Sequence, residues 1–384
     1  MNILWVSNGH GEDRIAQVLI QHWRLQFPQD QHQAMAMVGQ GLAYRELEVP
    51  LVANTFMPPS AGFAYLHPRL LWHDVQGGLL PHLKRQWRAL ATPADQPIDR
   101  YVAVGDIVPL LALWSARRLS ASVSFVACAL SDYYTAGKSS FDPLQVALLR
   151  RYGISTYARD ALTAANLRQR GVQAHALGNP MRDAVGDPNF ALTPVAEPAQ
   201  ALLLPGSHGD VFANLAHVLP LLQQAQRHRP LPLHWRIVVA PGIDTSMLQA
   251  MLETYQQTLS LSLLPAAGFG VALKQAVFAL GFSGTGNEQC VAHGVPVLSF
   301  PGAPEAQQYT YRFGEAQQRL LGPALRFYAT MWPELLAWQL AHFLTVPQTY
   351  RQIAQQIGRE RFGEAGTAER LIKHLRTERA ASLC

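Results

Sequence analysis

The feature that most constrains the fold of this chain is a repeated alternation of short apolar runs, glycine-bearing turns and amphipathic segments. Each run is apolar throughout rather than at every second residue, which is typical of a strand buried on both faces. The runs cover residues 2–7, 101–104, 123–128, 201–204, 237–240 and 277–280. Strand, turn and helix in this order predict an α/β fold whose parallel sheets are covered by helices on both faces.

A proline-rich stretch, GDPNFALTPVAEPAQ at residues 186–200, is the best linker in the chain. The 384 residues suffice for two domains, and each side of the linker has its own series of strands, turns and helices. We therefore expect two Rossmann-like, doubly wound domains that face one another across a cleft. The expected bounds are residues 1–180 for the first domain, 181–346 for the second and 347–384 for helices that pack back across the joint, with a hinge at Gly178, Asn179 and Pro180.

Composition narrows the class of protein. With 49% hydrophobic and 15% charged residues, the chain has the profile of a folded protein. Three cysteines lie far apart without a CxxC pair, so we expect neither a zinc site nor disulfides, and a reducing cytoplasm fits best. The first residues do not resemble a signal or transit peptide, and no apolar stretch reaches the length of a membrane span. The net charge of +5 favours anionic partners. Nothing beyond that mild charge supports nucleic-acid binding.

A glycine-rich turn, GFSGTGNEQCVAHGVPVLSFPG at residues 281–302, follows one predicted strand and precedes a helix expected to begin near Asn287. Helix N-termini at the carboxyl ends of parallel strands bind phosphate, so Ser283, Gly284, Thr285 and Gly286 are candidates for holding a pyrophosphate. The glycines do not follow GxGxxG and no P-loop lysine is present, which disfavours a nicotinamide dehydrogenase or an NTPase.

Glu288 in the same stretch has two interpretations. Thr285 and Glu288 match the spacing of a capping box, which would make both residues structural. A carboxylate one turn into a phosphate-binding helix is also well placed to accept the ribose hydroxyls of a nucleotide. A second turn, PGSHG at residues 205–209, follows another predicted strand and would form the facing wall of the same pocket. This second turn adds Gly206, Ser207 and His208 as candidates for nucleotide binding.

Five segments together resemble the nucleotide-sugar glycosyltransferases of the GT-B fold. The likeness is greatest to lipid-A-disaccharide synthases and the related proteins of cyanobacteria, and it covers most of the chain. The segments are NGHGED at 8–13, LGNPMRD at 177–183, LLLPGSHGD at 202–210, SGTGNEQCVAHGVPVLSF at 283–300 and GEAGTAERL at 363–371. The segments of the second half are the specific ones.

The resemblance implies that the second domain binds the donor, with residues 283–286 on the pyrophosphate, Glu288 on the ribose, and Gly206 and Ser207 lining the pocket. One position departs from the family. His208 stands where the family usually has arginine after Pro-Gly-Ser, and an imidazole cannot make the same permanent bidentate contact with phosphate. That departure affects donor binding, donor identity or activity itself.

Sugar transfer also needs a base for the acceptor hydroxyl. His10, in the first glycine turn, titrates in the right range, and Asp106 follows the strand at residues 101–104. Capping of a helix would explain Asp106, and equally Glu12 or Asp13, without catalysis. No DxD pair, HExxH motif or histidine–cysteine cluster occurs, so no metal and no cofactor beyond the UDP-sugar co-substrate is expected.

The segment at residues 56–90 predicts an amphipathic helix with an apolar face beside Lys84, Arg85 and Arg88. A basic amphipathic helix that carries a tryptophan, here Trp87, can lie on an anionic bilayer. Trp87, Arg85 and Arg88 are therefore candidates for contact with a membrane or a lipid-linked acceptor. An ordinary surface helix with a solvated basic side is the alternative.

Together with these features, the resemblance implies a metal-independent glycosyltransferase that moves a hexosyl or N-acetylhexosaminyl group from a UDP-sugar to an acceptor hydroxyl that is linked to a lipid. The expected location is the cytoplasm, with peripheral contact to an anionic membrane. Three alternatives stay open: a UDP-sugar 2-epimerase of the same fold, a degenerate GT-B protein that serves as a nucleotide-binding scaffold, and a membrane-binding module without chemistry.

Overall fold

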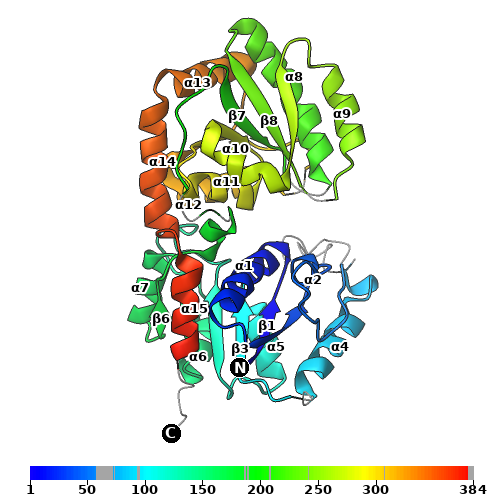
Figure 1. Cartoon of the computed structure of the whole chain (residues 1–384), viewed down its shortest axis with the longest axis vertical. Coiled ribbons are helices and arrows are strands. Elements are labelled where there is room, and N and C mark those ends of the chain that lie inside the picture. Colours follow the sequence, from blue (N-terminus) through cyan, green and yellow to red (C-terminus); the bar gives the residue numbers. More distant parts are fainter. Residues whose placement is uncertain are drawn as a thin grey trace. The chain divides into compact units, whose positions relative to one another are not determined.

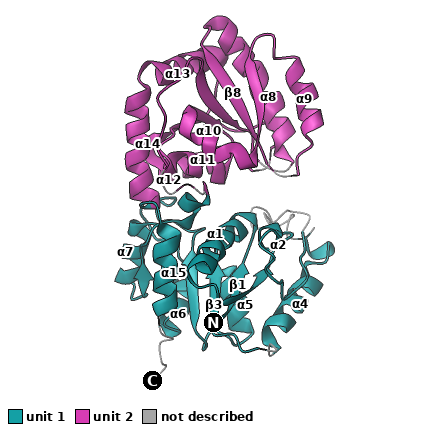
Figure 2. Ribbon diagram, in the orientation of Figure 1, with its two compact units in different colours: residues 1–184, 363–384 teal, residues 185–362 magenta. Residues whose placement is uncertain are grey.

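A computed structural model describes residues 1–57, 72, 74–92, 96–185, 187, 190–206, 209–240, 242–306 and 308–378. The chain divides into two compact units, and both are built from α/β layers (Figure 2). Residues 1–184 and 363–384 form the first unit, and residues 185–362 form the second. The division differs in detail from the predicted bounds, because the predicted tail at 347–384 is shared: its first helix belongs to the second unit and its last helix to the first.

The first unit contains a six-stranded sheet in which every strand pair is parallel, in the order β2-β1-β3-β4-β5-β6 (Figure 1). Strands β1, β3 and β4 are fully buried because their side chains are mostly apolar on both faces. Their bounds are β1 (Asn2–Ser7), β2 (Gln31–Ala36), β3 (Arg100–Val104), β4 (Val123–Ala127), β5 (Ser155–Ala158) and β6 (Ala174–His175).

The helices of the first unit cover this sheet, and α15, from the end of the chain, packs beside α1 (Figure 1). The bounds are α1 (His10–Gln26), α2 (Leu42–Arg45), α4 (Leu79–Ala91), α5 (Val108–Ser115), α6 (Pro143–Arg151), α7 (Ala161–Gln169), η2 (Pro180–Val185) and α15 (Thr367–Thr377).

The second unit repeats the architecture with a second parallel sheet of six strands, in the order β12-β11-β10-β7-β8-β9. The bounds of the strands are β7 (Ala199–Leu204), β8 (Leu233–Val239), β9 (Ser260–Pro265), β10 (Ala276–Gly281), β11 (Val297–Ser299) and β12 (Leu325–Phe327). The helices are α8 (Asp210–His228), α9 (Thr245–Glu253), η3 (Ala266–Gly268), α10 (Phe269–Gln275), α11 (Gly284–Ala292), α12 (Tyr311–Leu321), η4 (Gly322–Ala324), α13 (Pro333–Thr345) and α14 (Pro347–Phe362).

The predicted fold class is confirmed, since both units are doubly wound around parallel sheets and each of the six apolar runs overlaps a strand. Helix α11 begins earlier than predicted, at Gly284 rather than near Asn287. Several glycines of the predicted turns therefore belong to the first turn of a helix.

Two of the family-like segments, 177–183 and 363–371, lie together in the first unit. The Asp183 carboxylate accepts hydrogen bonds from the backbone N–H groups of Gly366 at 2.9 Å and Ala368 at 2.6 Å. A Cβ atom on Gly363 would lie only 2.9 Å from the Cα atom of Gly178. These contacts fasten the returning chain beside the point where it first leaves the unit, which gives both segments a structural role.

Within that joint, Asn179 is fully buried and its Oδ1 accepts a hydrogen bond from the backbone N–H of Met181 at 3.0 Å. Gly178 has a φ of 104°, which favours glycine, and Pro180 opens the short helix η2. The three residues thus form an ordered turn next to the crossing between the units. Their function as a hinge stays a prediction.

Among the described residues, no helix combines the length and the apolar character that spanning a bilayer would require.

Candidate functional site

In the second unit, the turns after β7 and β10 are neighbours at the carboxyl edge of the sheet. The register pairs Leu204 with Gly281, and the backbone N–H of Phe282 donates to the Leu204 carbonyl at 2.8 Å. Gly206 has a φ of 97°, and a Cβ atom there would lie 3.1 Å from the Phe282 carbonyl oxygen. The two glycine turns therefore adjoin, as the sequence predicts for two walls of one pocket. Ser207 and His208 lie outside the described residues.

The first turn of α11 is built to present backbone N–H groups. Ser283 is the N-cap, and its Oγ accepts the hydrogen bond from the N–H of Gly286 at 3.1 Å. The first N–H groups of a helix have no partner within the helix itself, so those of Gly284 and Thr285 are directed outward with the positive end of the dipole. An anionic group can be held there. The pyrophosphate role of residues 283–286 stays a prediction.

Glu288 lies one turn further along α11 and its side chain is 7% exposed. The alternative that Thr285 and Glu288 form a capping box is wrong, because the helix begins earlier and Ser283 is its cap. The purely structural explanation of this carboxylate that the sequence suggested is thereby removed. Its predicted role on the ribose of a nucleotide is not tested by these contacts.

A buried amide network fixes the start of α11, and the sequence analysis did not identify it. Asn287 is fully buried and its Nδ2 donates to the hydroxyl of Tyr309 at 3.1 Å and to Oε1 of Gln317 at 3.0 Å. Gln317 in turn donates to the Gly284 carbonyl at 3.0 Å. A Cβ atom on Gly281 would lie 1.8 Å from Asn287 Oδ1, so glycine is required at the end of β10. Gly281 was the one residue in the sequence that could have indicated this close packing.

In the first unit, Asp106 follows β3 and does what a capping residue does. Its Oδ1 accepts from the backbone N–H of Val108 at 2.9 Å at the start of α5. The Asn8 side chain donates to both carboxylate oxygens, at 3.2 and 3.1 Å. Burial nevertheless raises the pKa of Asp106 above its usual value. Both interpretations of Asp106 therefore keep support, because a capping contact and a raised pKa occur in the same carboxyl group.

Glu12 is one of the carboxylates of this region for which the sequence offered capping as the alternative to catalysis. No side chain caps α1, and the Glu12 side chain lies instead against two glycines. A Cβ atom added to Gly9 would lie 2.8 Å from Oε2 of Glu12, and one added to Gly105 would lie 2.7 Å from Cγ of Glu12. The glycine turns after β1 and β3 thus make room for this carboxyl group. Burial, followed by the charges of Asp106 and Asp13, raises the pKa of Glu12 to about 7.

Asp13 sits on the interior side of the same helix turn and is 1% exposed. Its Oδ1 accepts a hydrogen bond from the Ser7 hydroxyl at 2.5 Å, and the Tyr44 hydroxyl lies 2.5 Å from the same Ser7 oxygen. Burial raises the pKa of Asp13 to about 7. The buried contacts give Asp13 a structural role and distinguish it from Glu12.

His10, the other predicted base, opens α1 on the side of β2. A Cβ atom on Gly39 would lie 3.2 Å from Cε1 of His10, and Gly39 has a φ of 100°. The imidazole therefore packs over the turn that follows β2, whereas Asp106 follows β3. The two strands lie on opposite sides of β1. Asp106 is close enough to Glu12 for its charge to raise the pKa of Glu12, whereas His10 contacts the turn after β2.

Helix α4 exposes several of its apolar side chains and buries His82, Gln86 and Leu90. His82 bonds to the Met37 carbonyl at 3.0 Å, and Gln86 Nε2 donates to the same carbonyl at 3.0 Å. Trp87 is 46% exposed, and its Nε1 donates to the carbonyl of Ser115 on α5 at 3.1 Å. Further exposed side chains on these two helices are apolar or basic: Leu80, Leu83, Lys84, Arg85, Arg88, Leu111 and Trp114.

The predicted site residues thus lie at one place in the second unit and at two places in the first unit. Gly206, residues 283–286 and Glu288 gather at the carboxyl edge of the second sheet. His10 and Asp106 lie at the carboxyl edge of the first sheet, with Glu12 as an addition. Trp87, Arg85 and Arg88 are exposed on α4.

Comparison with solved structures shows that the chain has the GT-B fold. A UDP-GlcNAc 2-epimerase from Neisseria meningitidis bound to UDP-GlcNAc has a TM-score of 0.61 and 12% identity, covering 98% of this chain and 100% of that one. MurG from Acinetobacter baumannii has a TM-score of 0.60 and 15% identity, with coverage of 98% and 99%. The calicheamicin glycosyltransferase CalG4 has a TM-score of 0.60 and 15% identity, with coverage of 97% and 98%.

No family model and no curated protein matches the sequence. The structural neighbours include glycosyltransferases and UDP-GlcNAc 2-epimerases, and the likeness supports the GT-B fold that the resemblance implies. The narrower likeness to lipid-A-disaccharide synthases rests on the sequence segments alone.

Proposed function

We propose that this protein is a metal-independent glycosyltransferase that moves a sugar from a UDP-sugar to a lipid-linked acceptor hydroxyl. The observation that carries the proposal is the pair of adjoining glycine turns after β7 and β10, beside the buried Glu288, in a chain with the GT-B fold. Solved neighbours of this fold bind UDP or UDP-GlcNAc. The second unit is the proposed donor domain and the first the proposed acceptor domain.

The start of α11 would stabilise the leaving diphosphate. As the bond to the sugar breaks, negative charge grows on the diphosphate oxygens, and fixed N–H dipoles lower the energy of that charge. The N–H groups of Gly284 and Thr285 are the proposed donors, and the Asn287 and Gln317 network holds them in position. Glu288 is proposed to accept hydrogen bonds from the ribose hydroxyls.

Glu12 is the proposed base for the acceptor hydroxyl, in place of Asp106 or His10. With a pKa of about 7 it is partly ionised at neutral pH and can take a proton that a carboxylate of ordinary pKa would hold poorly. Burial raises the pKa of Glu12 most and the charge of Asp106 adds to it, while Asp106 itself is hydrogen-bonded to Asn8 and to the start of α5. His10 would then contact the acceptor or the sugar rather than the proton.

The outward apolar face of α4 is proposed to contact the membrane that holds the acceptor. Exposed tryptophan and leucine beside Lys84, Arg85 and Arg88 is the pattern of a helix that lies at an anionic bilayer surface. The inner side of the helix carries His82 and Gln86, which bond to the carbonyls of Ala36 and Met37, and Leu90, which lies in the core. Leu80, Leu83 and Trp87 are left exposed on the outer side. The protein would therefore be a peripheral membrane protein.

A second candidate is a UDP-sugar 2-epimerase, favoured by the likeness to a UDP-GlcNAc 2-epimerase at a TM-score of 0.61. The two activities separate in one assay. The protein is incubated with UDP-GlcNAc and UDP-glucose, with and without a membrane lipid extract, and UDP release and sugar stereochemistry are followed. Release of UDP only with lipid supports the transferase, and conversion of the sugar without lipid supports the epimerase. Nucleotide binding without either reaction would favour a degenerate scaffold.

A further inference from the structure

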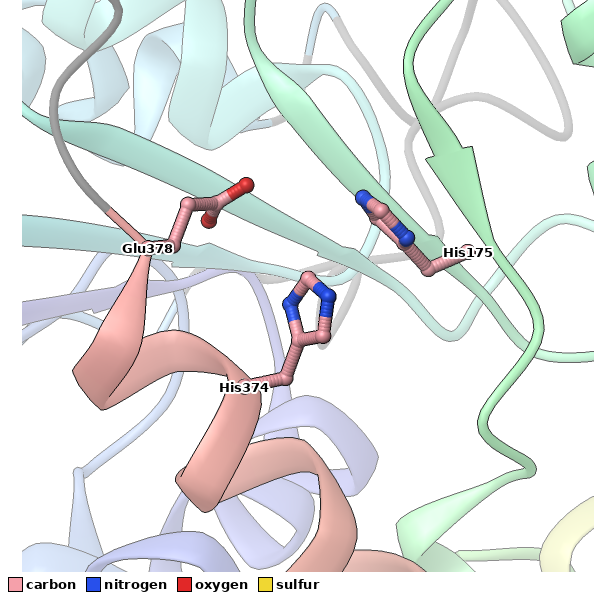
Figure 3. A group of neighbouring side chains, drawn as sticks. All are labelled: His175, His374 and Glu378. Atoms are coloured by element: carbon pink, nitrogen blue, oxygen red, sulfur yellow. The ribbon is translucent and has the colours of Figure 1, made fainter.

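A cluster of three side chains outside the proposed site lies where α15 meets the edge of the first sheet. His175 is on β6, His374 is on α15, and Glu378 follows the end of that helix (Figure 3). One potential ligand atom of each residue lies within 4.8 Å of the others. The rings of the two histidines are 4.4 Å apart between centroids. The three residues are far apart in the sequence, which is why no local motif announces them.

The hydroxyl of Tyr157 on β5 orients two of the three side chains. It lies 2.8 Å from Nδ1 of His374 and donates to Oε2 of Glu378 at 2.9 Å. An hydroxyl that gives its proton to Glu378 accepts one from Nδ1–H of His374, which leaves Nε2 of that ring as the atom with a lone pair. Such outer contacts fix the tautomer of histidines that bind metals.

Two polar atoms of the cluster are left without a hydrogen bond among the described residues. They are Nε2 of His175 and Oε1 of Glu378, and both are buried. The other oxygen of Glu378 is already used: besides Tyr157, the Ser124 hydroxyl donates to it at 3.3 Å and Nη1 of Arg100 lies 3.7 Å away. Buried polar atoms without partners are rare and require an explanation such as a missing ion.

We propose that His175, His374 and Glu378 bind one divalent transition metal ion of the zinc class, which fastens α15 to the first sheet. Two imidazole nitrogens and one carboxylate oxygen form a donor set typical of Zn²⁺, with water as the fourth ligand. Because the ligands come from β6 and from the far end of the chain, the ion would stabilise the closure of the first unit rather than take part in sugar transfer. The proposal departs from the expectation, based on local motifs, that no metal is bound.

The nearby positive charge limits the affinity. Arg100 neutralises part of the charge of Glu378, so the ion gains less electrostatic attraction than at a site with an unpaired carboxylate. We therefore expect a dissociation constant in the micromolar range rather than the much tighter binding of four-ligand structural zinc sites.

The test uses the full chain without an affinity tag, treated with chelator and then freed of it. Zn²⁺ is titrated by calorimetry, and Co²⁺ is titrated by absorption, because the visible bands of Co²⁺ report coordination geometry. The comparison includes the variants His374→Gln, His175→Gln and Glu378→Gln. The control is His228→Gln, which removes an exposed histidine at the end of α8 in the second unit.

We expect one equivalent of Zn²⁺ in the natural protein and in the control, and binding at least roughly tenfold weaker in each cluster variant. Zn²⁺ should also raise the melting temperature of the natural protein but not that of Glu378→Gln. This variant replaces a residue beyond the last turn of α15, so it should fold even if a histidine variant does not. Equal Zn²⁺ binding in natural protein and Glu378→Gln, or no stoichiometric binding at micromolar Zn²⁺, would overturn the proposal.

Discussion

At the scale of single residues, the environment of a carboxyl group decides between a structural and a chemical role. Asp13 and Glu12 are adjacent and both have a pKa of about 7, yet only Asp13 is hydrogen-bonded into the interior, to Ser7. Glu12 instead occupies space left by Gly9 and Gly105 at two strand ends. A strand end with a partly ionised carboxyl group is where the chemistry of a parallel α/β fold is expected.

Replacement of Glu12 by glutamine should therefore lower turnover by about 100-fold or more, since a positioned base contributes at least that much. In the natural protein, kcat/KM should fall as pH drops below about 7, because the carboxylate is then protonated. The measurement is a pH profile of UDP release. Asp13→Asn is the control, and equal loss of activity in both variants would contradict the base role.

Glu12→Gln should also make the folded protein more stable than the natural protein at alkaline pH. The pKa of Glu12 is raised from 4.5 to about 7 on folding, so the folded state binds more protons than the unfolded state between these values. The free energy of unfolding consequently decreases as pH rises from 4.5 to about 7, by up to about 3 kcal/mol from Glu12 alone. Glu12→Gln should remove that share, so urea unfolding at several pH values should show a flatter dependence. An unchanged slope would show that folding does not raise the pKa of Glu12.

At the scale of secondary-structure elements, glycine is needed where the start of a helix packs closely against the end of a strand. The apolar pattern predicts the strands well, because burial on both faces needs apolar residues throughout. It predicts helix starts less well, since the cap of α11 is Ser283 and not Thr285, and only tertiary contacts select between two possible caps. Gly281 illustrates this limit, because its close contact with the side chain of Asn287 cannot be recognised from the sequence.

Gly281→Ala should destabilise the protein by about 3 kcal/mol, because its Cβ atom would lie 1.8 Å from Asn287 Oδ1 and the buried amide network cannot move away easily. Gly209→Ala is the matched control, since a Cβ atom there would meet nothing within 4 Å. Its free energy of unfolding should stay within about 0.5 kcal/mol of the natural protein. Chemical denaturation of both variants checks this, and equal stabilities would contradict the packing of α11.

Helix α4 shows how an amphipathic pattern can predict a helix but not which face is buried. The apolar residues were expected to share one face, and several of them are exposed while His82 and Gln86 are buried. The polar residues are buried because backbone carbonyls of Ala36 and Met37 accept their hydrogen bonds. Neither carbonyl can be recognised from the sequence of the helix.

Replacement of Leu83 and Trp87 by glutamine should weaken binding to vesicles that contain anionic lipid by roughly tenfold per side chain, because each loses apolar area buried in the bilayer. The measurement is vesicle sedimentation at low ionic strength. Trp338→Gln removes a tryptophan of similar exposure, 53%, from α13 and should leave binding unchanged. Equal binding of the double variant and the natural protein would exclude α4 as the contact.

At the scale of the whole molecule, the chain leaves the first unit before residue 185 and returns to it at residue 363. The proline-rich composition near residue 190 predicted the first crossing approximately. The second crossing lies at the short break between α14 and α15, where Gly363 and Gly366 have positive φ, and the sequence analysis placed no boundary there. It depends on contacts such as that of Asp183 with Gly366, which join segments distant in the sequence. The position of the donor candidates at strand ends was predictable because glycine turns follow apolar runs, whereas the environments of Glu12 and Asn287 depend on the packing around them.

The central claim is that the carboxyl edge of the second sheet binds a UDP-sugar, and calorimetric titration of the full chain with UDP tests it most directly. The claim predicts saturable binding in the natural protein and in Gln289→Ala, a neighbour on α11. Glu288→Ala should bind UDP about 10- to 100-fold more weakly, the cost of losing hydrogen bonds to a charged group, and this loss of binding should exceed its effect on the melting temperature. No binding at millimolar UDP, or equal binding in the natural protein and Glu288→Ala, would contradict it.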